Sequence, residues 1–273
     1  MLPSTASAAI RVRSGIVYGT GAVAAGEVRL HLDLYRPPSA FRGRRPVAVL
    51  IHGGGFQQET RKEDNLVRVA RGLAAEGIVA ASIDYRLLPQ APEPSQRVAP
   101  LLAVLADSGY SRAIVAAVDD ALTAIDYLHG HARALGIDAT RMGILGSSAG
   151  AITADHVGYV LDDHGIPGPR LRFVGSLWGG VVIPPPEGGV GAVQLDRGEP
   201  ALFAVHGSDD PTVPVRLDDE LVARARAQGV RNEYHRIAGA GHGFIRSRFF
   251  TAHVHGTQTP YDRLLTFAAA ALR

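Results

Sequence analysis

Residues 143–151 read GILGSSAGA, and the stretch follows a short apolar run that is typical of a buried β-strand. Ser148 is the central residue of a G-x-S-x-G pattern, whereas Ser147 has no glycine at either corresponding position. Small residues two places before and after a serine leave room for a sharp turn from a strand into a helix, on which the hydroxyl is exposed. The stretch therefore predicts a nucleophilic Ser148 at the start of a helix over 148–160.

Strand-like and helix-like segments alternate on both sides of this turn. VRLHLDLYRP (28–37) alternates apolar and polar residues as a half-exposed antiparallel strand does. We expect further strands at 47–51, 78–85, 141–145, 173–179, 201–207 and 232–239, and helices at 61–76, 111–134, 148–160, 214–228 and 261–272. This alternation predicts an α/β fold with a mostly parallel twisted sheet, an antiparallel N-terminal edge and helices on both faces. Because no repeat or long linker divides residues 1–273, we expect a single domain.

The composition excludes several kinds of chemistry. The 273 residues are 46 % hydrophobic and 20 % charged, with a formal net charge of +2, and no basic block with interleaved aromatics indicates nucleic-acid binding. The absence of cysteine excludes disulfides, cysteine nucleophiles and cysteine-ligated metals. No apolar run reaches membrane-spanning length, so we expect a soluble protein, either cytoplasmic or secreted after removal of a leader absent from this chain. The oligomeric state leaves no signal in the sequence.

A serine nucleophile needs a base, and His242 is the candidate. It lies in GAGHGF, after the last predicted strand and before the last predicted helix. His235 lies within a strand instead, and His253 and His255 follow later in the chain. Two histidines without further ligands do not make a metal site, so we expect no bound metal. His242 is therefore predicted to take the proton of Ser148.

The stretch HGSDDPTVP (206–214) follows the strand before that histidine and offers the acid that orients the base. Asp209 and Asp210 are adjacent there, and composition alone does not choose between them.

The glycine-rich stretch HGGGF (52–56) follows the predicted strand 47–51. Glycines let backbone N–H groups approach a substrate without obstruction by side chains. We predict an oxyanion hole made by the amides of Gly54, Gly55 and Ala149. A phosphate cradle is the competing interpretation, but no Lys-Ser or Lys-Thr follows the glycines. His52 is predicted to fix the loop rather than to act as a base.

Five motifs occur in a fixed order, namely HGGGF, IDYRL (83–87), GSSAGA, HGSDDPTVP and GAGHGF. With them the chain resembles the α/β-hydrolase fold family, in its HGGG-type serine esterase and lipase branch. The family's HGxxDxxVP motif implies that Asp210 is the acid and Asp209 a neighbour. Only about 27 residues precede the first predicted strand. The chain is therefore more similar to small feruloyl and acetyl-xylan esterases than to relatives with a full cap domain, and we expect no such cap.

The resemblance implies a serine carboxylic-ester hydrolase that acts on small short-acyl esters through an acyl-enzyme, without cofactor or metal. An amidase, arylformamidase or acyl-peptidase with the same triad is the alternative. A non-catalytic ligand-binding member of the fold is a further one. The long segments 88–112, 181–199 and 246–260 are expected to shape the substrate pockets. Trp178 is either a wall of such a pocket or part of the core.

Overall fold

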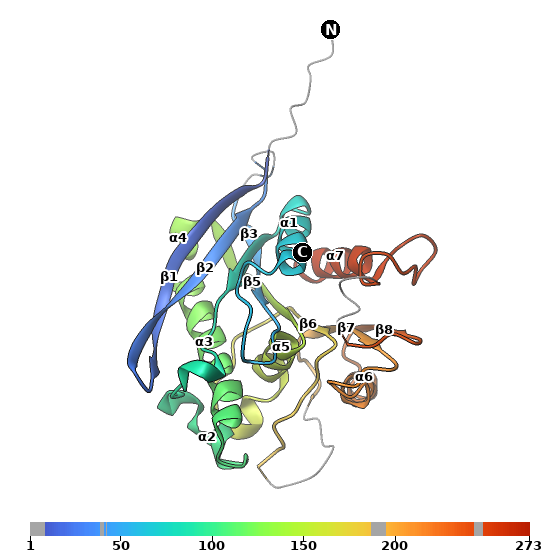
Figure 1. The fold of residues 1–273 in the computed structure, drawn as a ribbon. Helices are drawn as coiled ribbons and strands as arrows, with labels where there is room; N and C mark the ends of the chain where they lie inside the picture. Colours follow the sequence, from blue (N-terminus) through green and yellow to red (C-terminus); the bar gives the residue numbers. More distant parts are fainter. Residues whose placement is uncertain (1–8, 39–40, 42, 187–194, 243–247) are drawn as a thin grey trace.

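The computed structural model describes residues 9–38, 41, 43–186, 195–242 and 248–273. Its strands are β1 (Arg11–Val23), β2 (Gly26–Arg36), β3 (Arg45–Ile51), β4 (Val79–Ile83), β5 (Ile137–Ser147), β6 (Phe173–Leu177), β7 (Ala201–Gly207) and β8 (Asn232–Ile237). They form one sheet in the order β1-β2-β4-β3-β5-β6-β7-β8 (Figure 1). β2 is antiparallel to β1 and β4, and all other neighbours run parallel. The predicted α/β architecture with an antiparallel N-terminal edge is therefore confirmed.

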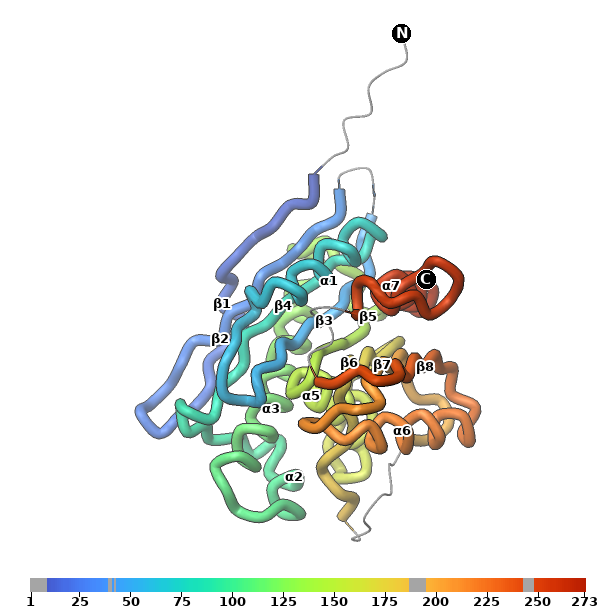
Figure 2. The backbone as a smooth tube through the Cα atoms, turned by 45° about the vertical axis from the view of Figure 1, so that its right-hand side comes forward, coloured from blue at the N-terminus to red at the C-terminus, as the bar shows by residue number. Residues whose placement is uncertain are grey.

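Helices cover both faces of the sheet because successive strand residues point to opposite sides. They are α1 (Asp64–Ala75), α2 (Ala99–Ala103), α3 (Gly109–Gly130), α4 (Ala132–Leu135), α5 (Ala149–Tyr159), α6 (Arg216–Ala227) and α7 (Pro260–Ala271), with 3-10 helices η1 (Leu88–Gln90), η2 (Gln96–Val98) and η3 (Asp162–His164). On β3, Val49 joins the core beneath α3, α5 and α6, whereas its neighbour Leu50 joins the core beneath α1 and α7. Figure 2 shows α1 and α7 next to each other on one face.

The sheet begins earlier in the chain than the sequence predicts. The predicted first strand, 28–37, is β2 in the structure. A further strand, β1, precedes it and starts at Arg11. Three glycines interrupt β1, and its register on β2 shifts between Arg13 and Ile16 and again between Val17 and Gly19. Such bulges switch side chains between the two faces of a sheet and hide the two-residue period by which a strand is found in sequence.

The long helix predicted over 111–134 is two helices. α3 begins earlier, at Gly109, because the hydroxyl of Ser108 accepts a hydrogen bond from the backbone N–H of Ser111 at 3.1 Å. At His131 the backbone leaves helical geometry, with φ −106°. α4 then follows and ends at Leu135, and Gly136 caps it with a φ of 62° that suits glycine.

The carboxyl ends of the parallel strands lie at one edge of the sheet, and the proline-rich segment 88–108 folds over this edge through η1, η2 and α2 (Figure 1). The backbone N–H of Leu88 donates to the carbonyl oxygen of Phe56 at 2.7 Å. The ring of Tyr110 packs edge-on against that of Phe56, with 5.7 Å between ring centroids. The segment is thus held against the HGGGF loop, as we expect of a segment that shapes the site.

The two other long segments are described only in part. Residues 187–194 and 243–247 lie outside the described residues. The expectation that 181–199 and 246–260 shape the substrate pockets can therefore be compared with the structure only for residues 181–186, 195–199 and 248–260. In the second segment, the fully buried ring of Phe249 packs against Trp178 with 5.9 Å between ring centroids. This part of the segment therefore belongs to the core.

Backbone hydrogen bonds continue past the ends of the strands at this edge. The N–H of Ser148 donates to the carbonyl oxygen of Leu177 at 2.9 Å. The N–H of Trp178 donates in the same way to Val205 at 2.7 Å. Each turn is thereby fixed to the neighbouring strand, from β5 to β6 and from β6 to β7.

Candidate active site

Ser148 stands directly after β5, at the turn into α5, with φ 54° and ψ −121°. A positive φ at a residue other than glycine costs about 1–3 kcal/mol and persists only where the surroundings impose it. Here the space is very tight. A Cβ on Gly146 would lie 2.3 Å from the carbonyl carbon of Gly150, and a Cβ on Gly150 would lie 2.2 Å from the carbonyl oxygen of Ile51. Both glycines of the G-x-S-x-G pattern are therefore needed for the turn that presents Ser148.

His242 and Asp210 complete a hydrogen-bonded line with Ser148. The Oγ of Ser148 lies 2.9 Å from Nε2 of His242, and Nδ1 of His242 lies 2.7 Å from Oδ2 of Asp210. Ser148 comes from the β5–α5 turn, Asp210 from the loop after β7 and His242 from the loop after β8. The fold thus brings together the three residues that the sequence singled out as nucleophile, acid and base.

Asp210 and Asp209 have different surroundings. The side chain of Asp210 is fully buried, and its Oδ1 accepts hydrogen bonds from the backbone N–H groups of Thr212 at 2.8 Å and Val213 at 2.9 Å. Asp209 is exposed, and its carboxylate accepts a hydrogen bond from the hydroxyl of Ser208 at 2.6 Å. Only Asp210 is placed to orient the imidazole.

The other late histidines lie apart from this line. His235 contacts Glu233 at 2.7 Å on β8, and His253 and His255 are exposed. Within the described part of the chain, no three His, Cys, Asp or Glu side chains gather in a group that could hold a metal ion.

The glycines of the HGGGF loop lie beside the nucleophile. Gly54 and Gly55 have φ values of 82° and 62°, which glycine adopts without steric cost. A Cβ on Gly53 would lie 3.4 Å from the Cβ of Ser148, so this loop and the nucleophile turn are in close contact. Ala149 is the first residue of α5. The three predicted oxyanion residues, Gly54, Gly55 and Ala149, therefore stand on the two segments that meet at Ser148.

The IDYRL stretch supports the HGGGF loop, a role that its place in the motif order does not reveal. The hydroxyl of Tyr85 donates to the carbonyl oxygen of Gly53 at 2.7 Å, and its ring stacks on His52 with 4.3 Å between centroids. Arg86 is buried and pairs with Asp120 at 2.7 Å, which ties this stretch to α3. Burial lowers the pKa of His52 to about 4, so its imidazole is neutral and serves as packing for the loop.

Comparisons with known proteins point to one family. The BD-FAE family model matches residues 32–98 and 109–173. Carboxylesterase NlhH of Mycobacterium tuberculosis is 31% identical over 153 residues, which are 56% of this chain and 40% of that protein. Esterase LipI of the same organism is 31% identical over 147 residues, which are 53% of this chain and 38% of that protein. The chain thus spans about two fifths of the length of these relatives.

A solved structure covers nearly the whole chain. Thermogutta terrifontis esterase 2, phosphoramylated by tabun, superposes with a TM-score of 0.65 at 22% identity, over 98% of this chain and 94% of that one. The chain has the α/β-hydrolase fold and is similar to esterases of that fold. The resemblance that the five motifs indicate is thereby confirmed.

In this α/β-hydrolase, a cavity of about 600 Å³ opens in front of Ser148. Most of the side chains in its lining are polar, and the lining residues are Gly53, Gly54, Gly55, Gln57, Gln58, Glu59, Glu63, Ser147, Ser148, Trp178, Thr212 and His242. Trp178 is only 2% exposed and is therefore part of the core, and it also lines this cavity. It is thus both a core residue and a wall of the pocket.

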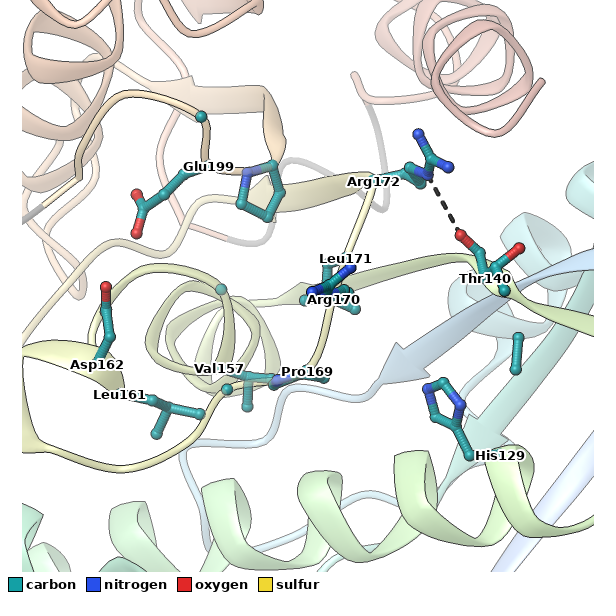
Figure 3. A pocket seen from close by; sticks show the side chains of 15 residues that line it. His129, Thr140, Val157, Leu161, Asp162, Pro169, Arg170, Leu171, Arg172 and Glu199 are labelled. Carbon is teal, nitrogen blue, oxygen red and sulfur yellow. Dashed lines mark hydrogen bonds between the residues drawn. The ribbon is translucent and has the colours of Figure 1, made fainter.

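A larger cavity, of about 770 Å³, lies at the opposite end of the parallel strands (Figure 3). Arg172, directly before β6, donates there to the carbonyl oxygen of Thr140 at 3.3 Å. Burial raises the pKa of Glu199 in this lining to about 8. The described residues of the lining include His129 but no serine, so this cavity offers no second serine nucleophile.

None of the helices in the described ranges has both the length and the apolarity needed to cross a membrane.

Proposed function

We propose that this chain is a serine hydrolase that cleaves carboxylic esters of short acyl chains through an acyl-enzyme. The observation that carries the proposal is the line from Ser148 to His242 to Asp210, with contacts of 2.9 and 2.7 Å, beside an open cavity. A serine hydroxyl is a weak nucleophile until a base removes its proton and an acid orients that base. The relatives' names, carboxylesterase and esterase, support the same reaction class.

In the proposed reaction, Nε2 of His242 takes the proton of Ser148 as Oγ bonds to the ester carbonyl carbon. The carbonyl oxygen gains the negative charge, and the backbone N–H groups of Gly54, Gly55 and Ala149 donate hydrogen bonds to it. The imidazolium then gives its proton to the leaving alcohol as the C–O bond breaks. Water, activated by the same imidazole, releases the acid and restores the serine. The sequence of steps uses no metal or cofactor.

Asp210 fixes the ring of His242 in the tautomer that this chemistry needs. Its Oδ2 accepts the Nδ1–H of the imidazole at 2.7 Å, which leaves Nε2 unprotonated toward Ser148. The carboxylate also stabilises the imidazolium that forms during the reaction.

The cavity supports short acyl chains, of about two to six carbons. Each buried methylene contributes about 0.8 kcal/mol of binding only where an apolar wall covers it. Gln57, Gln58, Glu63 and Thr212 line the cavity in front of Ser148, and Trp178 is the one large apolar side chain among the described lining residues, so a long chain finds no continuous apolar wall there. Thermogutta terrifontis esterase 2 has been solved with propionate and with butyrate bound, which agrees with small acyl groups in this fold.

A series of p-nitrophenyl esters from acetate to palmitate tests the proposal. We expect kcat/KM to be highest for the short acyl groups and to fall for the long ones, and to remain unchanged in EDTA. A matched p-nitroanilide separates ester from amide preference. A steady rise of kcat/KM to palmitate would make the chain a lipase and overturn the short-acyl part of the proposal.

A covalent inhibitor tests the nucleophile independently. Thermogutta terrifontis esterase 2 has been solved phosphorylated by paraoxon. We expect paraoxon to inactivate this chain and to leave one phosphoryl adduct, which tryptic peptide mass spectrometry places on Ser148. The Ser148→Ala variant should take up none. An adduct on any other residue would overturn the assignment.

A further inference from the structure

A line of fully buried polar side chains extends from Asp210 away from the cavity and into the protein. Its members are His206 at the end of β7, Asp218 on α6, Ser176 on β6 and Asp155 on α5, all with 0% exposure. None of the four lines the substrate cavity. Four elements thus bring polar groups together behind the acid of the triad, where apolar side chains would cost less.

The contacts along the line are continuous. Nε2 of His206 lies 3.3 Å from Oδ2 of Asp210, and Nδ1 of His206 lies 2.7 Å from Oδ2 of Asp218. The Oγ of Ser176 lies 2.9 Å from Oδ1 of Asp218 and 2.8 Å from Oδ2 of Asp155. Each contact needs one hydrogen, and this requirement determines which of the carboxyl groups and ring nitrogens are protonated.

At Ser176 a single hydroxyl lies between two carboxyl groups. A hydroxyl has one hydrogen and can donate to only one of them. The other carboxyl must therefore carry a proton and donate it to the Ser176 oxygen, because two carboxylates cannot both be satisfied there.

Asp155 is the acid that holds this proton. Its Oδ2 contacts Ser176 and the backbone N–H of Gly180 at 2.7 Å, and its Oδ1 has no hydrogen-bond partner among the described residues. Asp218, by contrast, faces an imidazole that can compensate its charge. A fully buried carboxyl without a cation is far less costly as the neutral acid.

At His206 both ring nitrogens face acceptors. Nδ1 faces the carboxylate of Asp218, while Nε2 faces the carbonyl oxygen of Val213 at 3.0 Å as well as Asp210. Each nitrogen must therefore carry a hydrogen, and a ring with two N–H groups is an imidazolium. If the Nδ1 proton of His206 moved to Asp218, the imidazole would be neutral, and no cation would face the carboxylate of Asp210.

We propose that His206 is a positioning residue, held as an imidazolium between Asp218 and Asp210, and that it keeps the buried acid of the triad ionised and oriented toward His242. Asp218 is its counter-ion, and Ser176 and the neutral Asp155 hold Asp218 in place. The kinetic part of this inference rests on the proposed esterase function, whereas the charge of His206 does not.

The electrostatics of the site reflect a balance between burial and the charge of His206. Burial raises the pKa of Asp218 above its usual value, whereas the hydrogen bond and charge of His206 lower it. Burial opposes a charge on His206, but the hydrogen bond with Asp218 and the charges of Asp218 and Asp210 outweigh it and raise the pKa of the imidazole. Burial, together with the nearby Asp218, raises the pKa of Asp155 well above its usual range. The titratable groups around His206 are Asp210 and His242 on the loops, Asp218 and Asp219 on α6, Asp155 on α5, and Tyr234 and Arg236 on β8, the last of which pairs with Asp219.

The first test measures the charge of His206 directly in the resting protein. Uniform ¹⁵N labelling of histidine gives two protonated nitrogens for an imidazolium and one for a neutral ring. His156 is the internal reference, because it is equally buried but forms hydrogen bonds only with backbone groups, with Nδ1 toward the Ile152 carbonyl and Nε2 accepting from the Ile183 N–H. Burial lowers the pKa of His156 to about 4, so its ring is neutral.

We expect the His206 signals to remain those of an imidazolium from pH 6 to 8, while those of His156 remain neutral. The variants His206→Gln and His156→Gln assign the two rings. A neutral His206 in this range would overturn the proposal, even if the chain hydrolyses no ester at all.

The second test follows the pH profile of ester hydrolysis. Without the cation, Asp210 attracts the proton of His242 more strongly, so His206→Gln should move the acidic limb of kcat/KM upward by about one pH unit. We expect kcat to fall at least about tenfold with KM nearly unchanged, since His206 does not touch the substrate cavity. Asp218→Asn, which removes the counter-ion, should move the limb in the same direction.

His156→Gln is the matched control and should leave the limb in place. A folded His206→Gln protein with an unmoved limb would show that His206 only fills space. If neither His206→Gln nor Asp218→Asn folds, the ¹⁵N spectrum of the unmodified protein decides, with the His206 ring assigned through its own backbone resonances. A wild type inactive on every ester would contradict the proposed function but not the charge of His206.

Discussion

The Oγ of Ser148 and the Nε2 of His242 lie 2.9 Å apart although 94 residues separate them in the chain. The serine is held by a strained turn after β5, and the histidine reaches it from the loop after β8. Ser147, the preceding residue, ends β5 and pairs in register with Leu177 instead. Two adjacent serines therefore have different surroundings, one in contact with His242 and one paired within the sheet.

Ser148→Ala should reduce ester hydrolysis by several orders of magnitude, because it removes the attacking oxygen. Ser147→Ala should retain most of the activity. Steady-state kinetics on p-nitrophenyl acetate measures both, with circular dichroism as the check on folding. Equal losses in two folded variants would contradict the assignment of the nucleophile.

Asp210→Asn should lower kcat far more than Asp209→Asn, by up to about 10⁴-fold, because an amide no longer holds the imidazole in the working tautomer. Asp209 is exposed and hydrogen-bonded to Ser208, so the Asp209→Asn variant should have nearly the kcat of the native protein. The same assay ranks the two variants. The reverse order would move the acid to Asp209.

Gly150→Ala should disturb both stability and activity, since the new Cβ would lie 2.2 Å from the backbone oxygen of Ile51. Such overpacking costs about 1–3 kcal/mol and displaces the turn that carries Ser148. Gly130→Ala at the end of α3 is the control, because no atom lies within 4 Å of its added Cβ. Urea unfolding and ester hydrolysis should be unchanged or slightly improved in that variant. An active Gly150→Ala protein of native stability would show that the turn can relax.

Glu199→Gln should stabilise the protein at alkaline pH. The pKa of Glu199 is about 8 in the folded state, above its usual value of 4.5, so the folded protein keeps a proton that the unfolded chain has lost. Stability is then lost as pH rises from about 4.5 to about 8 and is level above that range. The carboxyl is only half-buried, so we expect a Tm gain of about 2–4 °C at pH 9 and none at pH 4. Parallel curves of Tm against pH for the two proteins would contradict this.

The candidate triad could be predicted because its signals are local. A Cβ on Gly146, Gly150 or Gly54 would lie 2.1 to 2.3 Å from backbone atoms, so these positions require glycine and the requirement is visible in short motifs. Asp210 is different, because Asp209 beside it has the same chemistry and only the family motif chose between them. The structure adds the physical reason, which is burial and two backbone hydrogen bonds.

The supporting groups could not be predicted in this way. His206 is the first residue of HGSDDPTVP, but Asp218, Ser176 and Asp155 come from three other elements, and no spacing in the sequence links them to it. Their contacts exist only after β6, β7, α5 and α6 have packed. β1 was missed for a related reason, since its bulges depend on the register with β2 rather than on its own residue pattern.

The hydrogen bonds from the Ser148 amide to Leu177 and from the Trp178 amide to Val205 make the nucleophile turn part of the sheet itself. A group bonded in this way can open only when the central strands separate, and the amide of Ser148 should exchange with solvent as slowly as those in the core. Heating should then abolish activity and tertiary structure in one cooperative step. The nucleophile would survive, correctly positioned, for as long as the molecule stays folded.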